Sequence, residues 1–326
     1  MNRRRFGLMI PAAAGAPLPA QVARPQRAAG RIPDDPRLAR FNPLKRILVF
    51  DDFDEGINGW AELVSNHNGN LDDLRPVLRD MRPAQLSNCT FFDTGTHGSM
   101  SGTYALKLAT RARQFHTAAS IKRLTFQKPG PVQFEMYFTF KAEQTFDAPD
   151  PNWDGNFTPS ERNFGEMTIS NDVCMGEDGP RFICALRYRN ATPEGELVQK
   201  WMYKTSLHTT TKMDRAGQTL QSVDYHVREV NDWKEIPGGR QPLCFNETST
   251  KINWHYLRWV FDTAKQRNTE LQVNDLVMDL RGIPVPSYGQ GYRSLNHLLN
   301  FLLDVRANRA VRNFLFVDSA VISVDW

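Results

Sequence analysis

The amino-acid sequence predicts an all-β protein, an antiparallel jelly-roll β-sandwich with long loops. Residues 132–141 alternate between apolar and polar side chains, which is the two-residue period of a strand with one buried face. Similar segments recur along the chain with little helical periodicity between them, and this favours an antiparallel sandwich over a parallel sheet with helical crossovers. Clusters of Gly, Pro, Asn and Asp separate the segments, as is typical of turns.

The predicted strands run from residue 47 to the carboxyl end of the chain. One face of the strand at 132–141 is apolar throughout, so we expect it to lie in the core. Its members are Phe134, Met136, Phe138 and Phe140. The other predicted strands are 47–50, 104–109, 166–171, 181–189, 197–204, 223–227, 254–262, 270–274 and 314–324. Residues 71–81 are a weak helix candidate, and residues 294–303 fit either a short helix or a strand.

The chain of 326 residues is predicted to form one domain at 41–326 behind a flexible tail at 1–40. Its formal net charge is +4, from 40 Lys and Arg against 36 Asp and Glu. Six of the arginines lie in the first 31 residues, which contain no acid, so the remaining 34 basic residues are outnumbered by the acids. Because a nucleic-acid binder carries its positive charge on the folded domain, we expect no nucleic-acid partner.

The tail itself allows two interpretations. Arg3, Arg4 and Arg5, followed by Phe6 and a modest apolar stretch, resemble a twin-arginine export signal. Prolines interrupt that stretch, however, and the tail of a cytoplasmic protein explains the same residues, so localisation stays open with the cytoplasm slightly favoured. No apolar stretch approaches the roughly 18 residues that span a bilayer, and no membrane span is expected.

The cysteines and the standard motifs exclude several function classes. The four cysteines include no Cys-x-x-Cys pair, which argues against a structural zinc site. Cys174 and Cys184 flank a predicted turn, where buried thiols are favoured over a hairpin disulfide. The sequence lacks the Gly-rich phosphate loops and the Gly-x-Ser-x-Gly motif. We therefore expect no nucleotide cofactor and no serine hydrolase.

Three segments carry a resemblance to a known superfamily. Residues 50–60 resemble the first strand and turn of a carbohydrate-active jelly roll, and residues 314–326 resemble the closing strand, which lies beside the first in such folds. Residues 253–262 with 269–275 resemble a hairpin of the concanavalin-A-like lectin/glucanase superfamily. The resemblance implies the fold and a saccharide partner. The whole chain also resembles a bacterial family without an established function, which implies no catalytic residues.

Acidic residues near both ends of the predicted domain indicate a metal site. Asp52 and Asp54 follow the first strand, and Asp318 lies on the last. If the two strands pair as the resemblance implies, their carboxylates could join loop carbonyls around Ca²⁺, which takes six to eight oxygen ligands. The sequence thus predicts a structural calcium ion, with a solvated acidic turn as the alternative.

The polar face of the strand at 132–141 predicts a binding groove. In sugar-binding sandwiches, rows of amides, carboxylates and aromatic rings bind hydroxyl groups and stack on pyranose faces. The residues expected to bind substrate, from this strand and others, are Gln133, Lys141, Arg187, Arg189, Trp201 and Trp254. A wet sheet face with ordinary charge pairs explains the same row as well.

Two catalytic mechanisms fit such a groove. A glycosidase needs two carboxylates across the scissile bond, and Glu135 with Glu166, on strands that could be neighbours, is the best pair. The Glu-x-Asp-x-x-Glu signature of laminarinase-like members is absent. A polyuronate lyase needs a cation and a Tyr or His base, for which Tyr137 and His226 are candidates.

The sequence therefore predicts a carbohydrate-active protein whose partner is an oligo- or polysaccharide. A glycan-cleaving enzyme, with a glycoside hydrolase slightly ahead of a polysaccharide lyase, is favoured over a non-catalytic carbohydrate-binding protein. The reason is that no catalytic domain or long linker accompanies the sandwich. The sequence gives no prediction of oligomeric state.

Overall fold

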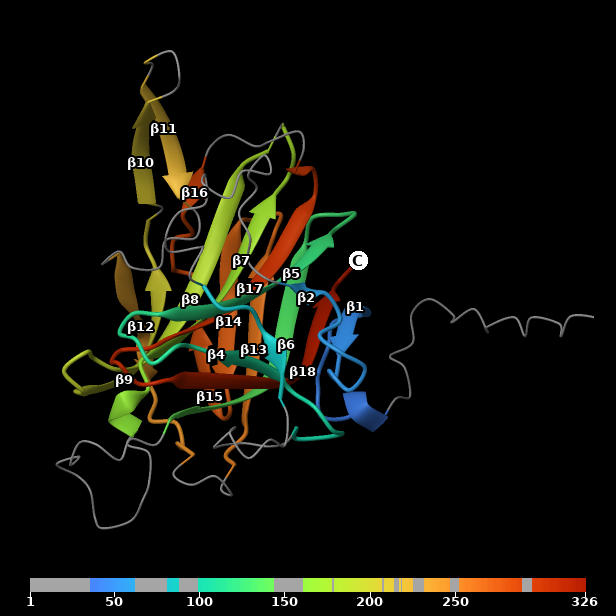
Figure 1. The fold of residues 1–326 in the computed structure, drawn as a ribbon. Helices are drawn as coiled ribbons and strands as arrows, with labels where there is room; N and C mark the ends of the chain where they lie inside the picture. The colour runs from blue at the N-terminus through green and yellow to red at the C-terminus, as the bar shows by residue number, and fades with distance from the viewer. Residues whose placement is uncertain are drawn as a thin grey trace, which may run out of the picture. The chain divides into compact units, whose positions relative to one another are not determined.

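Two antiparallel sheets face each other across one hydrophobic core in the computed structural model of the chain (Figure 1). The structure describes residues 36–61, 81–87, 99–143, 161–177, 179–206, 208–213, 217, 219–224, 232–246, 252–288 and 295–326. Nearly all regular structure in these ranges is strand, with short 3-10 helices at Pro36–Leu38 and Glu161–Asn163. The predicted antiparallel β-sandwich is confirmed. In the described ranges no helix is long and apolar enough to cross a membrane.

Each sheet contains eight strands. In sheet A the order is β15 (Leu276–Asp279), β14 (Arg267–Val273), β13 (His255–Asp262), β6 (Pro131–Ala142), β18 (Asn313–Val324), β4 (Leu106–Ala109) and β3 (Gln85–Leu86), with β1 (Arg46–Asp51) also beside β18. In sheet B it is β12 (Trp233–Arg240), β9 (Leu197–Lys204), β8 (Arg181–Ala191), β7 (Glu166–Cys174), β17 (Leu298–Arg306), β5 (Thr117–Thr125) and β2 (Trp60–Ala61), with β16 (Ser287–Tyr288) also beside β8. A separate hairpin consists of β10 (His208–Met213) and β11 (Thr219–Asp224).

The structure answers several questions that the sequence left open. The first and last strands pair antiparallel, with Arg46 opposite Val324. The ambiguous segment at 294–303 contains most of strand β17. The helix candidate at 71–81 lies, apart from its last residue, outside the described residues, as do the tail up to residue 35 and the end of the strand expected at 223–227. Cys174 and Cys184 are buried thiols without a disulfide.

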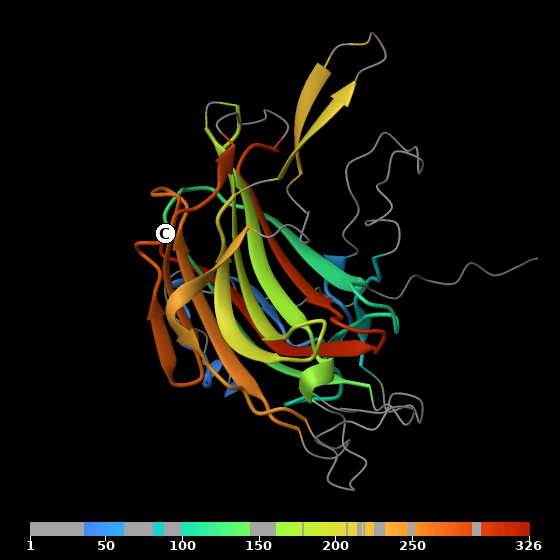
Figure 2. The same cartoon turned by 90° about the vertical axis from the view of Figure 1, so that its left-hand side faces the viewer.

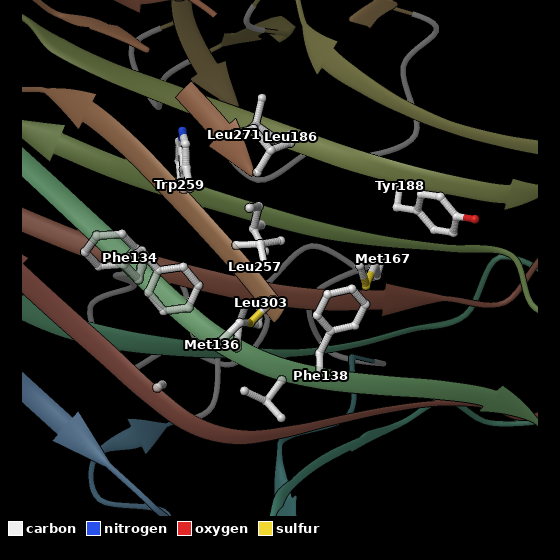
Figure 3. Close-up of a cluster of buried hydrophobic side chains, with 14 of the residues drawn as sticks. Phe134, Met136, Phe138, Met167, Leu186, Tyr188, Leu257, Trp259, Leu271 and Leu303 are labelled. Atoms are coloured by element: carbon white, nitrogen blue, oxygen red, sulfur yellow. The ribbon is translucent and has the colours of Figure 1, made fainter. Parts of the chain in front are cut away.

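The core forms where the apolar faces of the two sheets meet. The β6 side chains predicted to point inward do so, and Figure 3 shows three of them, Phe134, Met136 and Phe138, beside residues from both sheets. Phe134 stacks on Phe301 of β17, with 5.1 Å between the ring centroids, and Phe140 packs against Phe164 at 4.6 Å. All four rings are at most 1% exposed, so truncating one of them would cost about 3–5 kcal/mol of stability.

The outer face of sheet A is covered by the segment that precedes β1. Leu38 and Phe41 form a small apolar cluster with Val321 of β18, and the Phe41 ring lies 5.4 Å from that of Tyr137. Of residues 36–40, which were expected in the flexible tail, Leu38 is buried against the sheet. The long strands of sheet B, yellow-green to yellow in Figure 2, curve strongly. Their outer face carries the site described next.

Candidate functional site

The polar row of β6 does not line an open groove, because the preceding chain covers it. Glu135 is fully buried, and its Oε1 accepts hydrogen bonds from the Asn42 N–H (2.9 Å) and the Tyr256 hydroxyl (2.6 Å). Gln133 donates from Nε2 to the Asn42 carbonyl (2.7 Å). The Tyr137 hydroxyl donates to the Arg40 carbonyl at 3.1 Å. These side chains therefore fasten residues 40–42 to the sheet.

Neither tyrosine of this region is suited to abstract a proton. Burial raises the pKa of Tyr137, and the nearby Glu135 carboxylate raises it further against the opposing charge of Arg40. Burial also raises the pKa of Tyr256, and its hydrogen bond to Glu135 adds to the effect. A base needs a pKa near the working pH, so both phenols are poor bases. The other base candidate, His226, lies outside the described residues.

The strands of the expected carboxylate pair are not neighbours, so that expectation is wrong. Glu135 stands on β6 in sheet A, whereas Glu166 stands on β7 in sheet B. A glycosidase pair faces one bound sugar from two sides of one cleft. Side chains on the outer faces of opposite sheets do not share a cleft, because the core lies between them.

Three further candidates also lie away from Glu166. Trp201 points into the core, where its Nε1 donates to Gln241 Oε1 at 3.0 Å. Trp254 packs on the Phe314 and Phe316 rings at the outer face of sheet A. On the same face the Lys141 ammonium sits 5.2 Å from the centre of the Phe314 ring.

The carboxylates expected to bind calcium have partners within the protein. Asp318 Oδ2 accepts from the Ser101 N–H at 2.8 Å, and Asp54 Oδ1 accepts from the Tyr104 N–H at 3.0 Å, so both hold the segment 99–104. Asp52 forms an ion pair with Arg37. Burial raises the pKa of Asp318 to about 6. No group of three or more His, Cys, Asp or Glu in the described part of the chain is arranged to hold a metal ion.

Glu166 instead belongs to a charged row that crosses the outer face of sheet B. The strand register places Arg306 of β17, Glu166 of β7, Arg189 of β8 and Lys200 of β9 side by side. Glu166 Oε1 lies 3.3 Å from Arg187 Nη1 and 3.4 Å from Arg306 Nη1. One carboxylate thus faces three arginines, so the local charge is positive.

A small pocket opens where this row reaches the end of the sheet; we call it the Glu166 pocket. Its volume is about 40 Å³, and its wall includes Phe115, Glu166, Arg189, Pro193, Arg306 and Asn308. Gly165 lets the backbones approach here, because a Cβ at this residue would lie 2.4 Å from the Arg306 carbonyl oxygen. The loop around Pro193 is held by Arg309, whose Nε donates to the Pro193 carbonyl at 3.1 Å.

Phe115 is the most unusual residue of the Glu166 pocket. Its backbone has φ of 64°, in the left-handed region that bulky residues rarely adopt. The conformation is held by a hydrogen bond from its N–H to the Ala307 carbonyl (2.8 Å) and by the Arg306 guanidinium 4.6 Å from the ring centre. The ring is nevertheless 43% exposed. Strain of this kind collects at functional sites.

Two polar groups in the wall of the Glu166 pocket lack partners. The half-buried Arg189 side chain has no hydrogen bond or ion pair within the described residues. Asn308 donates from Nδ2 to the carbonyls of Arg162 and Thr192, both at 2.9 Å, but its buried Oδ1 accepts nothing within the same ranges. A donor cation and an acceptor oxygen therefore lie beside an exposed ring.

The sequence identified only part of this pocket. Glu166, Arg187 and Arg189 were candidates, because alternation marked them as polar faces of strands, and the structure brings these three together. Phe115 and Asn308 were missed, since both lie in loops next to strand ends. The positive φ of a phenylalanine leaves no signal in the sequence.

Comparisons with known proteins add a family and a set of structural likenesses. The model of a domain of unknown function, DUF6772, matches residues 29–326. No curated protein matches the chain. The chain is similar to a lectin from Bauhinia forficata in complex with GalNAc, with 8% identity, coverage of 74% of this chain and 99% of that chain, and a TM-score of 0.34.

Two further solved structures are similar at the same level. A legume lectin-like domain from Entamoeba histolytica has 8% identity and a TM-score of 0.31, over 76% of this chain and 92% of that chain. The potassium-bound carbohydrate recognition domain of Emp46p has 10% identity and a TM-score of 0.29, over 82% and 97%. Likenesses this loose carry no argument about a ligand or a site.

Proposed function

This chain belongs to the DUF6772 family, and we propose that it is a carbohydrate-binding protein without catalytic activity, which holds one edge of a sugar in the Glu166 pocket. The observation that carries the proposal is that Arg189, which has no side-chain partner among the described residues, lies beside the exposed, strained Phe115. A sugar is recognised by the combination that these two residues offer, an aromatic surface for the C–H face of the ring and polar groups for its hydroxyls.

The polar groups of the pocket match a sugar edge. Arg189 can donate to hydroxyl or carboxylate oxygens, and Asn308 Oδ1 can accept from a hydroxyl. Glu166 is already paired with two arginines, so its main role is to fix their guanidinium groups. Arg187 is itself held from the other side by the Trp233 ring, whose centre lies 3.9 Å from its Cζ. Glu166, Arg187 and Arg306 are therefore held in place before a ligand arrives, which lowers the part of the entropic cost of binding that comes from these side chains.

The size and charge of the pocket narrow the ligand class. A volume of about 40 Å³ holds a few water-sized groups, so it admits a substituent of the sugar while the ring itself lies on Phe115. The arginines favour a carboxylate as that substituent. We infer an oligo- or polysaccharide that contains uronic acid, in preference to a neutral glycan.

Glycan cleavage, which the sequence favours first, has less support in this geometry. Hydrolysis requires two carboxylates, and Glu166 is the only acid among the described residues of the pocket wall. Lyase chemistry requires a base, and no Tyr or His is present in the same set.

Calcium binding stays a prediction of the sequence, with Asp52, Asp54 and Asp318 as the expected ligands.

A glycan panel tests the proposal directly. We expect the wild-type chain to retain uronic-acid oligosaccharides without changing their mass. Phe115→Ala and Arg189→Gln should each weaken binding about tenfold or more, equal to about 1.4 kcal/mol, while the matched control Arg281→Gln, an exposed arginine paired with Asp279, keeps full affinity. Absence of binding throughout the panel, or equal binding by all variants, contradicts the site. Shortened or unsaturated products would establish an enzyme.

A further inference from the structure

A second, much larger pocket lies mainly on sheet A. It has a volume of about 320 Å³ and opens between β3, β4 and the beginning of β18 on sheet A. We call it the basic pocket, and its wall includes Arg82, Gln85, Lys107, Arg111, Arg312 and Phe314. Four of these six side chains are cations, and no described residue of its wall is acidic.

The cations are held in position by the fold. Arg82 and Ala118 form a parallel bridge, with the Arg82 N–H bonded to the Thr117 carbonyl (3.1 Å). The Arg111 N–H donates to His116 Nδ1 at 3.2 Å, which fixes the loop after β4. Lys107 is only 7% exposed, and its ammonium lies 5.9 Å from the centre of the Phe314 ring. Backbone bonds therefore fix the main chain at Arg82 and Arg111, from which their side chains reach the wall of the pocket.

One cation of the basic pocket lacks a partner in the described part of the chain. The half-buried Arg82 side chain has no hydrogen bond or ion pair within the described residues, and Arg312 pairs with Glu143 at 3.1 Å on the rim. Positive charge also gathers around His116. Burial, followed by the charges of Arg113, Arg111 and Arg82, lowers the pKa of His116 to about 4. Gathering like charges costs free energy unless an anion offsets it.

We propose that the basic pocket binds a small molecule that carries a phosphate or sulfate group. Guanidinium groups bind the oxygens of such anions in pairs, while an ammonium contributes a point charge. The volume falls at the lower end of the range for small-molecule sites, which suits a phosphorylated or sulfated sugar-sized compound. The basic pocket shares no lining residue with the Glu166 pocket, although Arg111 and Phe115 stand on the same loop between β4 and β5.

Titration calorimetry of the full chain with inorganic phosphate and with inorganic sulfate, at constant ionic strength, tests the proposal. We expect saturable binding of at least one anion, and the anion that binds identifies the ester. Arg82→Gln combined with Arg111→Gln should weaken it at least tenfold. Arg281→Gln, a surface arginine outside the pocket, should leave it unchanged. If the double variant does not fold, Arg312→Gln, whose side chain is 46% exposed, replaces it.

Three results would overturn the inference. They are the absence of saturable binding for both anions, equal binding by the pocket variants, and loss of anion binding in Arg189→Gln. The last would place the anion in the Glu166 pocket. Variants of Arg189 test glycan binding, and variants of Arg82 and Arg111 test anion binding. Failure of one proposal is therefore distinguishable from failure of the other.

Discussion

The outer faces of the two sheets both carry polar rows, and the described residues cover the row on sheet A but leave the row on sheet B open at a pocket. On sheet A the row of β6 is covered by residues 38–44, and its carboxylate at Glu135 is fully buried. On sheet B the row through Glu166 reaches a pocket with an exposed ring and an arginine, Arg189, that has no partner in the described ranges. The difference teaches that alternation identifies the polar face of a strand and says nothing of what covers it.

The covered row gives the largest expected effect on stability. Glu135→Ala removes the acceptor of two buried donors, the Asn42 N–H and the Tyr256 hydroxyl. We expect the free energy of unfolding to fall by about 3 kcal/mol, with glycan affinity unchanged, as measured by urea unfolding and glycan binding. Glu270→Ala is the control on the same sheet, because its pair with Arg258 is partly exposed and is worth less than about 1 kcal/mol. Loss of glycan binding in Glu135→Ala would mean that the glycan site lies on sheet A.

A second test of the covered face uses pH. The pKa of Asp318 is raised to about 6 by burial, from an ordinary value of 3.8. Between these values the folded chain binds more protons than the unfolded chain, so this group makes stability fall as pH rises from about 4 to 6. The fall should reach at most about 3 kcal/mol.

The measurement compares wild type with Asp318→Asn in urea at several pH values. The contribution of His116 has the opposite sign, because its lowered pKa of about 4 removes stability as pH falls below 6.5. Since His116 is present in both proteins, its effect cancels in the difference. Parallel stability curves for the two proteins would show that Asp318 is not buried as described.

The two sheets also show how much of the fold and of the candidate site the sequence predicts. Strict alternation in β6 determined which side chains enter the core, and the same period marked Glu166 and Arg189 as outward. The cover over sheet A was not predictable, because residues 38–44 have no periodicity and contact β6 through hydrogen bonds that span more than 90 residues of sequence, such as Asn42 to Glu135. Whether the polar face of a strand is exposed depends on the tertiary structure, so the alternation in β6 could not show that residues 38–44 cover this row.

The exposed pocket gives a smaller effect on stability and a larger one on binding. Phe115→Gly relieves the positive φ of this residue, so we expect the free energy of unfolding to change by less than about 1 kcal/mol while glycan affinity falls about tenfold. Phe115→Ala should lose the same affinity but keep the strain, and its melting temperature should be the lower of the two. Equal affinity in the glycine variant would mean that the ring does not contact the ligand.

Chelation is expected to have the smallest effect, and it concerns the junction of the first and last strands. Asp54 and Asp318 already accept backbone N–H groups of the segment 99–104, and Asp52 is paired with Arg37. Carboxylate oxygens engaged in this way hold the segment without a cation, so excess EDTA should leave the melting temperature within about 1 °C, because each kcal/mol shifts it by about 2–4 °C in a domain of this size. A larger fall in melting temperature, reversed by added Ca²⁺, would support the calcium site that the sequence predicts. It would also mean that segment 99–104, like residues 38–44, is held on sheet A by more than the hydrogen bonds described.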